Sequence, residues 1–102
     1  MKQLLVMLVA AFPLFAAGGS GTYELKQSTE RSVINLHAKK AGYISVKMLP
    51  DCGQMQLLDQ DDKILAFGHG YIAIKKRVEA GTYRLTVIPD KSDCTLKISV
   101  PQ

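Results

Sequence analysis

The stretch Val78-Glu79-Ala80-Gly81-Thr82-Tyr83-Arg84-Leu85-Thr86-Val87-Ile88 predicts a glycine turn that leads into a β-strand. Beyond the turn, polar residues alternate with three apolar ones, which are Tyr83, Leu85 and Val87. This period of two is typical of a strand that buries one face and turns the other toward water. We therefore expect Tyr83, Leu85 and Val87 in a hydrophobic core, with further strands packed against them.

Short alternating segments recur along the rest of the chain, separated by turns rich in Gly, Pro, Asp and Lys. The segments expected to form strands are 23–26, 31–38, 43–49, 54–58, 64–67, 71–74, 78–88 and 94–100. No segment shows sustained helical periodicity. The pattern predicts an all-β fold, a small antiparallel β-sandwich of about seven or eight strands.

The alternation also assigns side chains to faces. In the first strong strand, Ile34, Leu36 and Ala38 share one face, and Val33, Asn35 and His37 share the other. The other side chains expected to point inward are Ile44, Val46, Met48, Met55, Leu57, Cys94, Leu96, Ile98 and Val100. Because a Gly-containing turn joins segments 31–38 and 43–49, these two strands are expected to pair as a hairpin.

The N-terminus has the features of a secretory signal peptide over residues 1–17. A positively charged start is followed by an apolar stretch and then by small residues. That stretch is shorter than the roughly 20 residues of a membrane span, although a retained signal anchor is the alternative. Cleavage near Ala16 or Ala17 predicts a periplasmic, secreted or cell-surface protein with no transmembrane segment. Residues 18–30 then form a flexible lead-in with a possible edge strand, and residues 31–102 form the sandwich domain.

The chain has two cysteines, Cys52 and Cys94, and both follow the predicted signal peptide. An even count in a small exported domain favours a disulfide, which would stabilise the fold by on the order of 4 kcal/mol. The alternatives are two free thiols or two ligands of a soft metal. Neither cysteine belongs to a CxxC motif, which favours the disulfide.

The charge of the chain is mildly basic. The chain has thirteen Lys and Arg residues and nine Asp and Glu residues, and loss of the signal peptide would leave a net charge of about +3. This excess does not require nucleic acid as a partner. Five cations are expected at strand ends, where they would form a basic patch if the ends coincide: Lys39, Lys40, Lys75, Lys76 and Arg77. The alternative is that they serve solubility and protect sheet edges.

No catalytic residue, metal or cofactor is expected. His37 and His69 lack the spacing of a metal site, which needs three or four converging ligands, and are expected at the surface. The acidic run Asp59, Asp61 and Asp62 lacks the EF-hand pattern and is expected to form a solvated hairpin tip. There is no GxSxG motif and no carboxylate pair with a reason for a shifted pKa.

Several motifs in residues 34–100 follow the order of a known family. They are the Gly42-Tyr43-Ile44-Ser45-Val46 strand, the strand–polar turn–strand unit at 56–65, the Ala80-Gly81-Thr82-Tyr83 turn and the final strand at 95–100. In this order the chain resembles the bacterial pre-peptidase C-terminal domain. The resemblance implies a jelly-roll-like sandwich without catalytic activity, associated with secretion, folding, or surface and matrix binding. The cysteine pair and the absence of an attached enzyme depart from the family pattern.

Three functions are therefore open. The first is an exported binding or accessory module that recognises a protein or an anionic envelope polymer, such as lipopolysaccharide or a glycan. The second is a periplasmic inhibitor or immunity protein that inserts the segment Gly68-His69-Gly70, expected as a mobile exposed loop, into an enzyme or toxin. The third follows from Ala17-Gly18-Gly19-Ser20-Gly21, which resembles the mature start of dispersin-type surface coat proteins with an acylated N-terminus.

Overall fold

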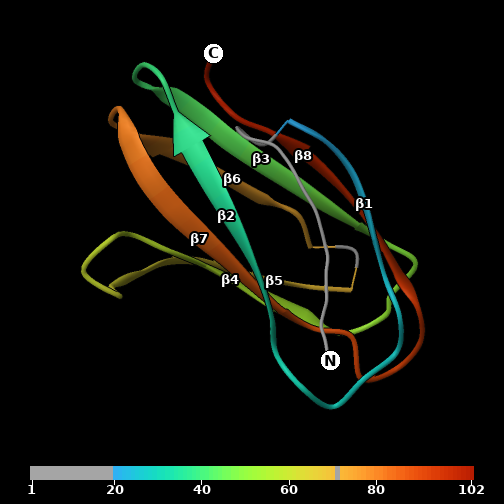
Figure 1. Ribbon diagram of the computed structural model, residues 1–102. Coiled ribbons are helices and arrows are strands. Elements are labelled where there is room, and N and C mark those ends of the chain that lie inside the picture. Colours follow the sequence, from blue (N-terminus) through green and yellow to red (C-terminus); the bar gives the residue numbers. More distant parts are fainter. Residues whose placement is uncertain (1–19, 71) are drawn as a thin grey trace, which may run out of the picture.

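The computed structural model describes residues 20–70 and 72–102, so the predicted signal peptide lies outside the described residues. Within them the regular elements are eight strands in two antiparallel sheets of four, which lie face to face (Figure 1). Sheet A has the order β1 (Gly21–Leu25), β8 (Cys94–Ser99), β3 (Gly42–Leu49), β6 (Ile74–Val78). Sheet B has the order β2 (Ser32–Ala38), β7 (Gly81–Ile88), β4 (Gln54–Leu58), β5 (Ile64–His69). The predicted all-β sandwich is confirmed.

The connections give the sandwich a jelly-roll topology. The chain crosses from one sheet to the other after every strand except β4, which pairs with β5 in a hairpin. The expected hairpin of segments 31–38 and 43–49 is therefore wrong. β2 pairs with β7, whereas β3 pairs with β8 and β6 in the other sheet. A short Gly-containing turn suits a crossover as well as a hairpin, and packing between the two buried faces decides between them.

The core lies between the sheets and is formed by the alternating inward side chains. Tyr83, Leu85 and Val87 of β7 are buried, as predicted. The other inward residues predicted for segments 43–49, 54–58 and 94–100 are also buried.

No helix in the described part of the chain is long and apolar enough to cross a membrane.

The turn before β7 explains the Gly-Thr-Tyr motif. Gly81 has a φ of 154°, a conformation that L side chains rarely adopt. Two residues later Tyr83 enters the core and is only 8% exposed. Its hydroxyl donates a hydrogen bond of 2.7 Å to the carbonyl oxygen of Glu79, so the buried phenol is satisfied by the turn itself.

The largest difference from the predicted strands concerns β6. The strand expected at 71–74 is β6 at Ile74–Val78, and Ile72 forms only an isolated bridge with His69. The three cations that follow Ile74 are thus inside an edge strand, not beyond its end. β-Strands tolerate lysines at a sheet edge, where their charged ends reach water while Ile74 and Val78 stay buried.

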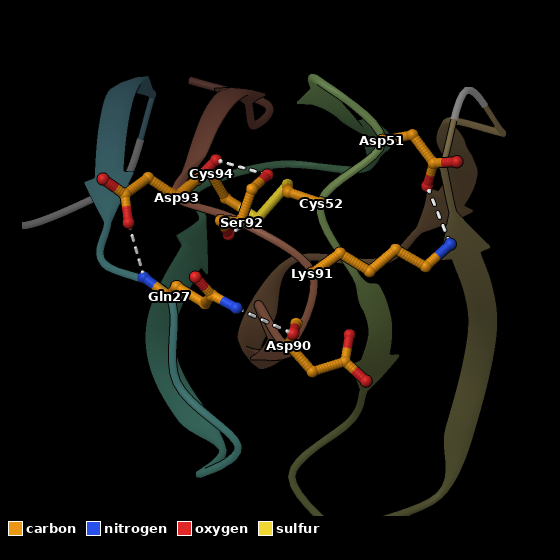
Figure 2. Close-up of a disulfide and its surroundings, with 8 residues drawn as sticks. All are labelled: Gln27, Asp51, Cys52, Asp90, Lys91, Ser92, Asp93 and Cys94. Atoms are coloured by element: carbon orange, nitrogen blue, oxygen red, sulfur yellow. Dashed lines mark hydrogen bonds and ion pairs between the residues drawn. A yellow bond between two sulfur atoms is a disulfide. The ribbon is translucent and has the colours of Figure 1, made fainter.

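The predicted disulfide between Cys52 and Cys94 is confirmed, with both cysteines buried and their Cα atoms 5.5 Å apart. It ties the β3–β4 connection to the start of β8. Hydrogen bonds bring other loops to this end. The Lys91 N–H donates to the Cys52 carbonyl oxygen over 3.0 Å. The Gln27 N–H donates to an Asp93 carboxylate over 2.7 Å (Figure 2). The disulfide thus holds the end of the sandwich where the β1–β2, β3–β4, β5–β6 and β7–β8 connections meet.

Candidate functional site

The outer face of sheet A carries an unusual set of side chains. Because directly opposed residues in antiparallel strands point to the same side, the strand register assigns this face. Arg77 lies opposite Tyr43, Lys75 lies opposite Ser45, and Lys47 lies opposite Lys97. We call the set Tyr43, Lys47, Lys75, Arg77 and Lys97 the basic face.

The basic face contains the whole charge excess of the described chain. Its four cations share the outer side of sheet A with a single strand carboxylate, Glu24 of β1. The described residues contain twelve basic and nine acidic side chains. Without the four cations and Glu24, eight side chains of each sign remain, and their charges balance. The net charge of about +3 is therefore concentrated on one side of one sheet, where it produces a local positive potential.

The four cations of the basic face have no carboxylate partner among the described residues. The ion pairs found there join Lys26 to Asp93, Arg84 to Asp62 and Lys91 to Asp51, and none of them includes a cation of the basic face. Cations without an ion-pair partner on the open face of a sheet are available to an anionic ligand without first breaking an internal ion pair.

Tyr43 orients the ammonium group of Lys75. Its side chain is 50% exposed, and the Nζ atom of Lys75 lies 5.4 Å from the centre of its ring. At this distance the ammonium is attracted to the ring face, which restricts the flexible lysine side chain. Lys75 is therefore held over the face of the sheet.

The five cations expected at strand ends lie in three different positions, and their role as a binding patch stays a prediction. Lys75 and Arg77 belong to the basic face. Lys76 lies opposite the buried Ile44, so its side chain starts on the inward side of edge strand β6 and reaches solvent there. Lys39 and Lys40 are exposed in the β2–β3 turn, at the end of sheet A where Gly42 pairs with Val78.

Lys47 and Lys97 were missed by the sequence analysis. Each occupies a polar position of an alternating strand, which is the signal that could have found them. They belong to segments far apart in the chain, and only the pairing of β3 with β8 places them opposite each other.

The expectation of an exposed loop at His69 is wrong. Gly68 and His69 belong to β5, and both Gly68 and Gly70 are buried. A Cβ on Gly68 would come within 2.5 Å of the Met55 side chain, so this segment is packed against the core. His69 itself is exposed at the edge of sheet B, and His37 lies on the opposite edge strand β2, with two strands between them.

The acidic run is a hairpin tip, as predicted, between β4 and β5. One carboxylate oxygen of Asp59 accepts hydrogen bonds from the backbone N–H groups of Asp61 (2.8 Å) and Lys63 (3.0 Å). Asp62 pairs with Arg84. These oxygens stabilise the turn, and no group of three or more residues suited to a metal ion is found in residues 20–70 and 72–102.

A shallow hollow of about 90 Å³ lies beside the disulfide, lined by Glu24, Leu25, Lys26, Asp93, Cys94 and Thr95. Pockets for small organic ligands are typically about 300–1,000 Å³. The hollow is also occupied at its rim by the Lys26–Asp93 ion pair. Its size favours no small-molecule site, and the open basic face is the better candidate.

Comparison with solved structures identifies the fold. The chain is similar to the pre-peptidase C-terminal domain of a collagenase from Bacillus anthracis, with a TM-score of 0.63 and 22% sequence identity. The match covers 81% of this chain and 90% of that domain. The chain therefore has the fold of a pre-peptidase C-terminal domain, as its motifs predicted. No family model and no curated protein matches it, and the likeness of residues 17–21 to dispersin-type proteins is not borne out.

Proposed function

We propose that this protein is an exported, non-catalytic binding module whose basic face recognises an anionic polymer of the cell envelope, such as lipopolysaccharide or an acidic glycan. The observation that carries the proposal is the concentration of the charge excess on one sheet face, where no ion pair among residues 20–70 and 72–102 neutralises it. Such a surface attracts polyanions at long range and holds them through several weak contacts.

Two further features support export and a binding role. A buried disulfide between Cys52 and Cys94 suits an oxidising compartment. The fold is that of a C-terminal domain of a collagenase, which suits an accessory role. In cells, we expect the mass of the exported protein to correspond to cleavage near Ala16 or Ala17, with two protons lost to the disulfide. Retention of the full-length mass in the cytoplasm would contradict export.

Two neighbouring lysines provide a matched test of the basic face. Lys75→Ala removes a cation from this face, and Lys76→Ala removes the same charge from the other side of the same strand. With heparin and lipopolysaccharide as probes, we expect Lys75→Ala to weaken binding several-fold and Lys76→Ala to leave it nearly unchanged. Equal effects of the two variants, or no binding by the parent protein, would refute the proposal.

An inhibitor or immunity function is a second candidate, and exposed apolar side chains on sheet B favour it. Ile64 is 44% exposed, Phe67 63% and Ile72 55%, and all lie on or directly after edge strand β5. Apolar side chains at an accessible edge suit a protein partner. The test is whether the purified chain lowers the activity of an exported enzyme that it captures. Phe67→Ser should then abolish both effects, whereas Lys75→Ala should abolish neither.

A further inference from the structure

We infer that the four cations of the basic face form one continuous track for a linear anionic polysaccharide, with the Lys47–Lys97 pair as its most positive point. This inference rests on the proposed function and deepens it. It defines the ligand as an extended chain with repeated charges, and it adds two residues that the linear sequence does not bring together.

The spacing of the cations supports a linear ligand. Arg77 and Lys75 are two residues apart on β6, about 7 Å along the strand. Lys47 lies one strand over and two residues further along, a step of about 8 Å from Lys75, and Lys97 is opposite Lys47 at about 5 Å. The track runs diagonally over β6, β3 and β8 for roughly 16 Å. A compact anion would reach two of these cations, whereas an extended polyanion reaches all four.

The Lys47–Lys97 pair is the strongest single argument for a ligand. Like charges directly opposite each other in a sheet destabilise it. The third residue in this row is Thr22 of β1, so no carboxylate in the row relieves the repulsion. An anionic group that binds between the two ammonium groups removes this repulsion and gains two charge-assisted hydrogen bonds.

The surroundings of the track favour a polysaccharide over a peptide. Peptides that bind by adding a strand need a free sheet edge, but β3 and β8 are interior strands with hydrogen-bonded neighbours on both sides. The residues beside the lysines are hydroxyl-bearing: Ser45 and Ser99 oppose each other in the adjacent row. Hydroxyls both donate and accept hydrogen bonds, which matches the hydroxyls and acidic groups of a charged sugar chain.

The test uses the purified, disulfide-bonded protein with heparin-derived oligosaccharides of defined length. The double variant Lys47→Gln/Lys97→Gln is compared with Lys63→Gln/Lys76→Gln, which removes the same charge away from the track. We expect the first variant to lose affinity by on the order of tenfold and the second to stay near the parent. The dependence of log Kd on log salt concentration should become shallower by about two for the track variant alone.

Oligosaccharide length and thermal unfolding supply independent readouts. Affinity should rise with length until the probe spans the track and then level off. Because replacing the lysines removes a repulsion, the track variant should keep its melting temperature, which separates lost binding from lost folding. If only Lys75→Ala weakens binding and the track variant does not, the inference fails while the proposed function stands. Failure of the parent to bind heparin overturns both. Tighter binding of poly-glutamate with equal charge overturns the polysaccharide assignment.

Discussion

Tyr83 connects a local sequence motif to the core. The glycine turn leads the chain into β7, where the phenol ring of Tyr83 is buried. Its hydroxyl donates a hydrogen bond to the Glu79 carbonyl oxygen. One side chain thus fills core volume and fixes the turn that precedes its strand. This arrangement explains why the Ala-Gly-Thr-Tyr motif was a good guide to the fold, since the hydrogen bond that fixes its turn joins residues only four positions apart.

Removal of the hydroxyl in Tyr83→Phe should destabilise the protein by about 1 kcal/mol, because a hydrogen bond is lost and a carbonyl is left without its partner. The free energy of unfolding in urea measures this change. Thr82→Ser, on the exposed face of the same strand, is the control and should have little effect. An unchanged stability of Tyr83→Phe would show that the hydrogen bond does not hold the turn.

Tyr23 predicts a pH dependence. Burial of this inward-facing residue of β1 raises its pKa above the ordinary value of 10.0. Above about pH 10 the unfolded chain therefore ionises this phenol more readily than the native state, and stability falls as pH rises through the native pKa. Below about pH 10 the Tyr23 phenol is neutral in both states, so its full contribution to stability is present. Melting temperatures between about pH 8 and pH 11 should fall less steeply for Tyr23→Phe than for Tyr43→Phe, and identical slopes would contradict the prediction.

Among the strands, β6 shows how pairing changes the meaning of a sequence run. Read along the chain, Lys75, Lys76 and Arg77 form one basic cluster. In the sheet their side chains alternate, so two belong to the basic face and the middle one lies on the inward side of the edge. We propose that the two residues of the basic face attract a ligand, whereas the middle one protects a free strand edge.

Lys76→Val should increase self-association, because an inward-pointing lysine discourages another strand from pairing with the edge of β6. Size-exclusion chromatography with light scattering, over a range of protein concentrations, measures the effect. The same substitution at Lys63, in the β4–β5 turn, should leave the parent's behaviour unchanged. A variant at position 76 that associates no more than the Lys63 variant would show that other features protect this edge.

At the level of the whole molecule, the disulfide and the crossovers act together. A jelly roll has few local pairings, so its sheets form only when distant segments meet. The bond between Cys52 and Cys94 closes a loop over a sequence separation of 42 residues and fixes one end of both sheets. In a small domain such a constraint is a large part of the total stability.

Replacing both cysteines by alanine should reduce the free energy of unfolding by about 4 kcal/mol, chiefly through the greater freedom of the unfolded chain. Urea unfolding of the double variant and of the parent, with and without reductant, measures this loss. The reduced parent should approach the variant. A loss below about 1 kcal/mol would mean that the loops around Gln27, Lys91 and Asp93 hold this end without the covalent bond.

Alternation along the chain was sufficient to find most of the strands, the buried side chains of β3, β4, β7 and β8, and the β-sandwich class, because these properties depend on neighbours in sequence. The even cysteine count likewise predicted the disulfide. Strand pairing was different: the partners of β2 and β3, the strand position of His69 and the meeting of Lys47 with Lys97 were settled only in three dimensions. A turn signal carries no information about which distant strand packs alongside, since that choice depends on burying both sheets against each other. The charges that make the candidate site are brought together by that non-local choice.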